Sequence, residues 1–258
     1  MNKALVQYSR IILTLLTLGG IWLLSATAPA AAATYRMVTL EYPPYEYSED
    51  GVIKGAAVEI VREAFKLMGH EVIIEILPFA RSIEMLKNGD ADGIFTFFRT
   101  PERESFAFFS QEAVVQQRIS LWVRKDSKIT FDGNLTSLKD YRFGVVRKTS
   151  YGERFDGAVK KGTLKIAESY TIEEAIKLLV NGRVDIWVSN HDGAVFELKK
   201  IGQSKEVKEL LPSLQNIPAY VGFSRKRNLE GLRNDFDAAL RTLKKSGKYA
   251  IILKGYSH

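Results

Sequence analysis

No cysteine occurs among the 258 residues of this chain, so disulfide bonds cannot contribute to its stability. A bacterial lipoprotein needs a cysteine at its cleavage site, so that class of protein is excluded too. The three histidines, His70, His191 and His258, lack the spacing of metal ligands, and we expect neither a metal nor another cofactor. The sequence also lacks a G-x-S-x-G nucleophile motif, a P-loop and a dinucleotide-binding fingerprint.

Apolar runs long enough to cross a membrane are absent as well. The run at residues 11–24 falls short of the roughly 20 residues that a membrane-spanning helix needs. Lys3 and Arg10 precede this run, and three alanines at residues 31–33 follow it in a small-x-small pattern. The sequence therefore predicts a signal peptide over residues 1–33, cleaved near Ala33, and a soluble mature protein exported to the periplasm.

Charge of one sign is not concentrated anywhere in the mature part of the chain. Without Lys3 and Arg10, the 37 Lys and Arg residues become 35, against 30 Asp and Glu residues, so the net charge is +5. Most of these charges are interspersed, which is typical of a solvated surface rather than of a nucleic-acid-binding one. We expect a monomer with one large domain or two small ones, a small-molecule ligand and no nucleic-acid partner.

A helix–Asn-Gly–strand unit occurs twice in the sequence. Residues 84–96 and 177–189 both contain an Asn-Gly pair that would end a helix, an aspartate, and then an apolar strand ending in a hydroxyl residue. A weaker similarity lies upstream, where a Tyr-Arg pair at residues 35–36 and another at residues 141–142 each precede an apolar strand. Chance could produce one such similarity, but two in the same order favour a repeated lobe.

The order of the expected elements agrees with two lobes. The first lobe would contain strand 37–40, helix 57–68, strand 72–77, helix 81–88 and strand 93–98, and the second would contain strand 143–146, helix 151–160, strand 164–167, helix 171–181 and strand 184–189. This alternation predicts an α/β fold with parallel sheets covered by helices on both faces. Strands 119–123 and 219–223 would join the lobes, and helix 229–246 would pack on the first one. The expected boundaries are residues 34–121 and 222–258 for lobe I and residues 122–221 for lobe II.

Arg103 is an unusual residue at its predicted position. Thr100 as N-cap and Pro101 at the first helical position predict a helix start, where a cation opposes the helix dipole. A bound anion would explain this arginine, and so would an ion pair with Glu102, Glu104 or another carboxylate. The residues around Arg103 leave both explanations open.

Polar and aromatic side chains follow the carboxyl ends of the predicted strands. These segments are residues 40–42, 96–98, 147–150 and 189–192. Ligands of open α/β sheets bind beyond these strand ends, so we expect a cleft between the lobes. Its hydroxyls, amide, aromatic rings and cations suit a small polar molecule that is anionic or zwitterionic. Thr149 and Ser150 precede a predicted helix, where one of them could be an N-cap, an anion-binding group, or both.

Several of these motifs resemble those of the bacterial extracellular solute-binding proteins of family 3, the polar-amino-acid type that serves ABC transporters. The resemblance is carried by E-Y-P-P-Y at residues 41–45, by the block from Thr96 to Arg103, by Phe109-Ser110, and by residues 144–150, and it extends over nearly the whole mature chain. It implies a periplasmic-binding-protein-like fold, two α/β lobes joined by two crossover strands with the ligand cleft between them. It also implies that Tyr42 contacts the ligand and that Arg103 and Ser150 bind its α-carboxylate.

The chain departs from the family pattern at three positions. Asn190 occupies the place of an aspartate that takes the ligand's α-amino group, although Asp192 lies two residues further on. Phe98 replaces a small hydroxyl residue, and Lys148 replaces a glycine. The changes at Asn190 and Phe98 weaken the case for a standard α-amino acid and leave a less charged or more aromatic ligand open. The segment at residues 77–81 resembles a subgroup in which Phe79 could stack opposite Tyr42, with Arg81 near the pocket.

The expected function is capture of a small carboxylated polar solute by hinge closure and its presentation to the membrane subunits of an ABC transporter. The expected ligand-binding residues are Tyr42, Phe79, Arg81, Thr96, Phe98, Arg103, Thr149, Ser150, Asn190 and Asp192, with no catalytic residue. Two alternatives stay open at this point. One is an enzyme resembling cyclohexadienyl or arogenate dehydratases, with Glu41, Glu153 or Asp192 as general acid. The other is a stand-alone periplasmic ligand sensor.

Overall fold

The computed structural model describes residues 32–147 and 149–256, and Thr34–His258 forms one compact unit. Residues 1–31 of the predicted signal peptide lie outside the described part, as do Lys148 and His258. Within the described residues, no helix has the length and apolar character needed to cross a membrane.

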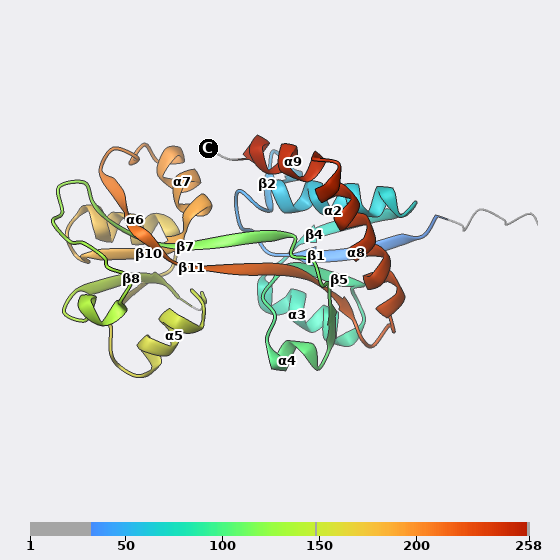
Figure 1. Cartoon of the computed structure of the whole chain (residues 1–258), viewed down its shortest axis with the longest axis horizontal. Helices are drawn as coiled ribbons and strands as arrows, with labels where there is room; N and C mark the ends of the chain where they lie inside the picture. Colours follow the sequence, from blue (N-terminus) through green and yellow to red (C-terminus); the bar gives the residue numbers. More distant parts are fainter. Residues whose placement is uncertain (1–31, 148, 257–258) are drawn as a thin grey trace, which may run out of the picture. The chain divides into compact units, whose positions relative to one another are not determined.

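Strands and helices alternate along most of the described chain (Figure 1). The first half contains β1 (Thr34–Thr39), β2 (Tyr47–Glu49), β3 (Val52–Lys54), α2 (Ala56–Leu67), β4 (Glu71–Ile76), α3 (Phe79–Asn88), β5 (Gly93–Phe97), α4 (Pro101–Glu104), β6 (Ala107–Phe109) and β7 (Val115–Arg124). The second half contains the 3-10 helix η2 (Leu135–Leu138), β8 (Arg142–Val146), α5 (Glu153–Lys160), β9 (Lys165–Ser169), α6 (Ile172–Val180), β10 (Ile186–Asn190), α7 (His191–Lys200), β11 (Val207–Ser224), α8 (Glu230–Lys245) and α9 (Lys248–Tyr256).

The strands form a sheet in the order β4-β1-β5-β11-β7-β10-β8-β9, with β6 also paired to β11. Pairing is parallel within the outer parts, where β1 lies between β4 and β5, and β8 lies between β9 and β10. The long strands β7 and β11 pair with each other antiparallel and belong to both outer parts. This topology confirms the predicted fold of two α/β lobes joined by two crossover strands.

Each lobe has its own hydrophobic core. In lobe I, the ring of Phe236 in α8 lies 6.0 Å from that of Phe65 in α2 and 5.5 Å from that of Phe223 in β11. Helix α8 therefore packs on lobe I, as predicted, and Figure 1 shows α2, α8 and α9 on one side of the sheet with α3 on the other. In lobe II, the rings of Phe143 in β8 and Phe155 in α5 lie 5.5 Å apart.

The repeated sequence unit corresponds to a repeated hydrogen-bonding arrangement. In lobe I, the backbone N–H of Arg36 donates to the Asp92 carboxylate at 2.7 Å, and the Asp92 N–H donates back to the Arg36 carbonyl at 2.8 Å. In lobe II, Arg142 and Asp185 form the same pair at 2.8 and 2.9 Å. Asp92 and Asp185, each three residues after the glycine of its Asn-Gly pair, therefore join one strand to its parallel neighbour.

Other elements differ from the predictions at their ends or were not predicted. Helix α3 begins at Phe79 rather than Arg81, and α5 begins at Glu153 rather than Tyr151. The hairpin of β2 and β3, strand β6, and helices α7 and α9 were missed. Helix α7 matters most for the site, because it starts directly after Asn190 and brings Phe196, Glu197 and Lys200 to the pocket.

Candidate functional site

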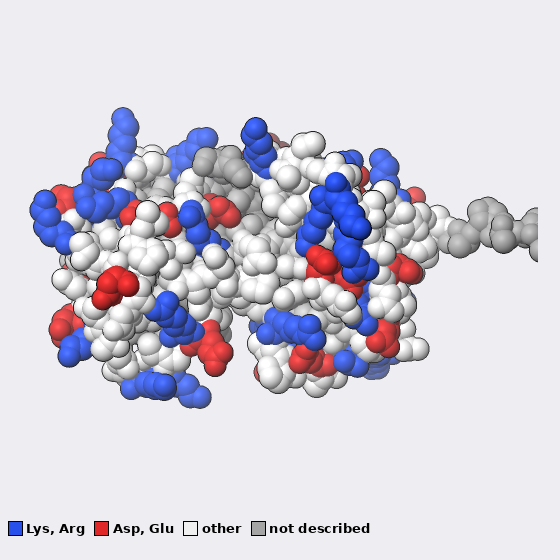
Figure 2. Space-filling model, viewed as in Figure 1, with Lys and Arg blue, Asp and Glu red and all other residues white. Residues whose placement is uncertain are grey.

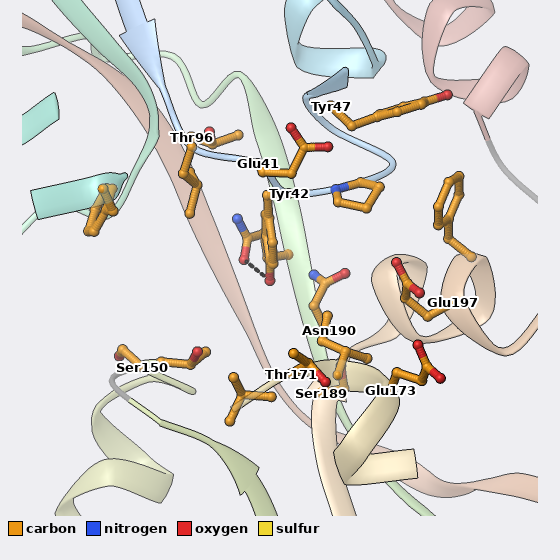
Figure 3. Close-up of a pocket in the computed structure, with 18 of the residues that line it drawn as sticks. Glu41, Tyr42, Tyr47, Thr96, Ser150, Thr171, Glu173, Ser189, Asn190 and Glu197 are labelled. Carbon is orange, nitrogen blue, oxygen red and sulfur yellow. Dashed lines mark hydrogen bonds between the residues drawn. The ribbon is translucent and has the colours of Figure 1, made fainter. Parts of the chain in front are cut away.

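A pocket of about 930 Å³ lies between side chains of both lobes and of the crossover strand β7. Figure 3 shows Glu41, Tyr47 and Thr96 on one side, with Ser150, Glu173 and Glu197 on the other. Of the ten predicted ligand-binding residues, those that line the pocket are Tyr42, Phe79, Thr96, Phe98, Arg103, Thr149, Ser150 and Asn190. Arg81 and Asp192 are not among its lining residues.

The Arg103 side chain is half-buried against aromatic rings. Its guanidinium carbon lies 4.4 Å from the ring centroid of Phe97 and 5.4 Å from that of Phe79. One terminal nitrogen donates a hydrogen bond to the Phe98 carbonyl at 2.8 Å. The backbone N–H of Arg103 is held by the Thr100 hydroxyl at 3.3 Å, which confirms Thr100 as the N-cap of α4. These contacts fix the guanidinium plane at the pocket wall.

No carboxylate neutralises Arg103 by direct contact within the described part of the chain. Glu104, one of the partners considered from the sequence, pairs with Arg99 instead. Burial lowers the pKa of Arg103, and the charge of Glu102 opposes this shift without forming an ion pair. Burial makes the charged guanidinium less favourable, so an anion bound next to Arg103 would offset this cost.

Thr96 connects the pocket to a buried carboxyl group that was not predicted from the sequence. The Thr96 hydroxyl lies within hydrogen-bond distance of two acceptors, Glu46 Oε1 and the Phe95 carbonyl, the latter at 2.7 Å, and 3.3 Å from the Thr39 hydroxyl. Glu46 is 0 % exposed, and burial raises its pKa well above the usual value. Thr96 has a φ of 53°, which is unusual for a β-branched residue and indicates a constrained strand end.

Tyr42 lies in the middle of the pocket, and its hydroxyl donates to Gln117 Oε1 at 3.3 Å (Figure 3). Gln117 comes from β7 and is 2 % exposed, so Tyr42 is tied to the crossover strand. Burial raises the pKa of Tyr42, which keeps the phenol neutral. The sequence did not identify Gln117, because an isolated glutamine in a strand carries no local signal for a binding site.

Both polar atoms of the Asn190 side chain form hydrogen bonds within the protein. Its Oδ1 accepts the Gly193 N–H at 2.9 Å, so Asn190 is the N-cap of α7. Its Nδ2 donates to the Tyr45 hydroxyl at 3.2 Å, and that hydroxyl donates to Asp192 Oδ2 at 2.6 Å. These hydrogen bonds join the loop before β2 in lobe I to the start of α7 in lobe II.

Thr149 and Ser150 line the pocket from an exposed segment of lobe II. The N-cap of α5 is Gly152, so the prediction that one of these two residues could cap that helix is wrong. The helix starts two residues later because Gly152 adopts a φ of 90°, which a glycine accepts readily. The Ser150 hydroxyl donates to Asp156 Oδ2 at 2.5 Å and accepts the Gly152 N–H at 3.2 Å.

Carboxylates outnumber cations among the described lining residues. The charged ones are Glu41, Glu49, Glu173 and Glu197, with Arg103 and Lys200 of opposite sign. Lys200 lies 3.6 Å from Glu197, and Lys177 lies 2.6 Å from Glu173. Glu41 accepts the Ser48 N–H at 3.1 Å. The pocket thus offers groups of both signs, with the negative ones in excess.

Comparisons with known proteins identify the family and the fold. The family model of the bacterial extracellular solute-binding proteins, family 3, matches residues 36–258. An arginine-binding periplasmic protein from Mannheimia haemolytica is 26% identical over 241 residues, which cover 92% of this chain and 94% of that protein.

Two solved structures share the fold. One is an ancestral arginine-binding protein bound to arginine, with a TM-score of 0.71, 22% identity, and coverage of 87% of this chain and 98% of the other. The second is a probable amino-acid ABC transporter extracellular-binding protein from Bacillus subtilis, with a TM-score of 0.76, 20% identity, and coverage of 87% and 97%. The chain belongs to the bacterial extracellular solute-binding proteins of family 3.

Proposed function

We propose that this chain is a periplasmic binding protein that captures an amino acid or a related small carboxylated solute and presents it to an ABC transporter. The observation that carries the proposal is Arg103, a half-buried guanidinium in the pocket wall without a carboxylate partner among the described residues. The family and the name of the Mannheimia haemolytica relative support an amino-acid ligand.

A carboxylate suits Arg103 for geometric reasons. A guanidinium has five N–H donors, and the Arg103 side chain uses one terminal nitrogen for the Phe98 carbonyl. Its stacking against Phe97 and Phe79 fixes the plane, which favours binding of a planar carboxylate by two parallel hydrogen bonds. A neutral ligand group would leave the charge of Arg103 without compensation.

Lobe closure would complete the binding of the carboxylate. Arg103 belongs to lobe I, whereas Thr149 and Ser150 belong to lobe II and are exposed. Bending at β7 and β11 would bring these hydroxyls toward the ligand and exclude water from it. The closed protein is then the form that the membrane subunits of a transporter would bind.

The first prediction concerns Arg103→Ala. We expect ligand affinity to fall by at least ~2 kcal/mol, because one partner of a buried charged hydrogen bond is removed. A thermal-shift screen of the standard amino acids, their amines and aromatic acids identifies the ligand, since a specific ligand raises the melting temperature in proportion to the logarithm of its excess over Kd. Isothermal titration calorimetry with that ligand then measures the loss.

Arg62→Ala is the matched control. Arg62 also donates to a backbone carbonyl, that of Ile53 at 3.0 Å, but it is exposed and does not line the pocket. We expect this variant to bind like the wild type. Equal affinities of Arg103→Ala and wild type would show that Arg103 does not bind the carboxylate.

A separate measurement addresses the dehydratase alternative. Of its three candidate acids, Glu41 lines the pocket, Asp192 is hydrogen-bonded to Tyr45, and Glu153 lies exposed in the first turn of α5. We expect no aromatic product when the protein is incubated with prephenate or arogenate and followed by absorbance. Product formation that scales with protein concentration and depends on Glu41 would contradict the binding-protein assignment.

A further inference from the structure

The lobe II position where a negative charge was expected opposite an amino group carries Asn190, which cannot supply one. Its carbonyl oxygen already caps α7, and its amide nitrogen donates to Tyr45. An amino-acid ligand held at Arg103 by its carboxylate would still bring an ammonium group into the pocket. The compensating anion must therefore come from another residue.

Glu46 has the geometry of such an anion. Glu46 is 0 % exposed, and its Oε1 lies within hydrogen-bond distance of the Thr96 hydroxyl. Thr96 itself lines the pocket. Its second oxygen, Oε2, is buried and has no hydrogen-bond partner among the described residues. A buried carboxyl oxygen without a partner is costly, and such groups often have a functional role.

The direction of the Thr96 hydroxyl links Glu46 to the pocket. Once Glu46 is ionised, its Oε1 can accept the Thr96 hydroxyl proton, and the Phe95 carbonyl is the other acceptor within reach. The lone pairs of Thr96 Oγ1 are then available to accept a hydrogen bond. A ligand N–H group that donates to Thr96 Oγ1 would thus be stabilised by the charge of Glu46, because the Thr96 hydroxyl links the two groups.

We propose that Glu46 is the anionic counterpart of the ligand's ammonium group, acting through the Thr96 hydroxyl, and that it loses its proton to the solvent when the ligand binds. This inference rests on the proposed function, because it requires a ligand with an ammonium group in the same pocket. Glu46 is a positioning residue here, since Thr96 and not Glu46 contacts the ligand. No covalent bond forms or breaks in the ligand.

The surroundings of Glu46 favour its neutral form before the ligand arrives. Burial raises the pKa of Glu46, and the negative charge of Glu41 acts in the same direction. The described groups that face Glu46 are the hydroxyls of Thr39 in β1 and Thr96 in β5, with Glu41 and Tyr42 from its own loop. No cation appears in this set, so a ligand ammonium would be the positive charge that makes ionisation favourable.

The sign of the pH dependence follows from this order of events. The free protein holds the Glu46 proton up to a raised pKa, whereas the complex holds it only to a lower one. Between the two values, binding releases a proton, so affinity increases as pH rises, by up to about tenfold per pH unit for a single released proton. Above the pKa of Glu46 in the free protein, Glu46 is ionised before and after binding, so affinity no longer changes with pH through this group.

Calorimetry in buffers of different ionisation enthalpy counts the released protons directly. The probe is the standard L-amino acid that binds most tightly in the thermal-shift screen, titrated into the wild type, Glu46→Gln, Thr96→Val and Thr96→Ser. We expect release of up to about one proton by the wild type and by Thr96→Ser, and none by Glu46→Gln or Thr96→Val. Valine is β-branched like threonine, so Thr96→Val removes the hydroxyl with little change in the shape of the side chain.

Glu75→Gln is the control, because Glu75 lies in β4, pairs with Arg36 and does not line the pocket. We expect it to release protons like the wild type. Equal proton release by Glu46→Gln and wild type, or binding of no amino acid at all, overturns the proposal for Glu46. If the wild type releases no Glu46-dependent proton but Arg103→Ala still lowers affinity, the proposed function stands without the role of Glu46. If Arg103→Ala binds the ligand as tightly as the wild type, the proposed function itself is overturned.

Discussion

At the scale of residues, two ionisable groups beside the pocket differ in how burial affects them. Arg103 is charged and half-buried, with its plane fixed by aromatic rings and one carbonyl. Glu46 is fully buried, and this burial raises its pKa well above the usual value. A zwitterionic ligand offers a carboxylate to Arg103 and an ammonium to the Thr96 hydroxyl in front of Glu46. Ligand binding would therefore relieve both groups at once.

Glu46 also affects the pH dependence of folding. Its pKa in the folded protein is raised above the value of about 4.3 in an unfolded chain. The folded state then binds more protons than the unfolded state between these two values, so the free energy of unfolding falls as pH rises through this window. We expect Glu46 to contribute a loss of up to about 1.4 kcal/mol per pH unit, measured by urea unfolding of the ligand-free protein from pH 5 to pH 8.

The comparison with Glu46→Gln isolates this contribution. Glutamine does not ionise, so the variant should lack that part of the slope and become more stable relative to the wild type as pH rises. Glu75→Gln should keep the wild-type slope, because its partner Arg36 lowers the pKa of Glu75 and leaves it ionised throughout this range. Parallel stability curves for wild type and Glu46→Gln would contradict a neutral Glu46.

Of these two residues, Arg103 could be recognised from the sequence and Glu46 could not. Arg103 was recognisable because a cation in the first turn of a helix opposes the helix dipole. Glu46 follows Tyr45 in a segment whose conformation could not be predicted, and its burial depends on the approach of β1 and β5 from elsewhere in the chain. A carboxylate becomes unusual only through this tertiary environment.

At the scale of elements, α7 and the loop before β2 are joined by the Tyr45 hydroxyl. Tyr45 is 3 % exposed, donates to Asp192 at 2.6 Å and accepts from Asn190 at 3.2 Å. The ring of Tyr47, the first residue of β2, lies 5.5 Å from that of Phe196 in α7 and adds an aromatic contact next to this hydrogen bond. This hydrogen-bonded contact between the lobes positions the pocket residues at the start of α7.

Tyr45→Phe tests this contact with little change of volume. The substitution keeps the ring and leaves the part-buried Asp192 oxygen without its donor, so we expect a loss of stability of about 1–3 kcal/mol. Ligand affinity should fall as well, because the contact holds a lobe II element against lobe I. Urea unfolding and calorimetry measure the two effects.

Tyr249→Phe is a matched control within lobe I. Tyr249 also donates a part-buried hydrogen bond, to the Val114 carbonyl at 2.9 Å, but it does not line the pocket. We expect a loss of stability without a change in ligand affinity. The inter-lobe role of Tyr45 would have to be abandoned if its variant binds ligand as tightly as Tyr249→Phe does.

Periodicity predicted most elements that have a clear apolar face. Helices α2, α6 and α8 were found within a residue or two of their ends, and the two Asn-Gly stops coincide with positive φ values of 77° at Gly89 and 68° at Gly182. Helix α7 was missed because its start depends on the capping of Asn190, which was interpreted only as a ligand residue. The short strands β2, β3 and β6 give too few residues for a pattern.

At the scale of the whole molecule, the two-lobed fold follows from the repeated unit. The reciprocal bonds of Asp92 with Arg36 and of Asp185 with Arg142 show that the sequence similarity has a structural cause. Figure 2 shows Lys and Arg interspersed with Asp and Glu on the visible face, as the composition predicted. The side-chain network across the pocket could not be predicted, because it depends on how residues far apart in the sequence meet.

The central claim is that Arg103 binds the carboxylate of the ligand. Its most direct test is a calorimetric cycle of wild type and Arg103→Ala, each titrated with the tightest-binding amino acid and with the amine that its decarboxylation gives. We predict that the carboxylate contributes at least ~2 kcal/mol to binding in the wild type and almost nothing in Arg103→Ala. An equal contribution of the carboxylate in both proteins would contradict the account.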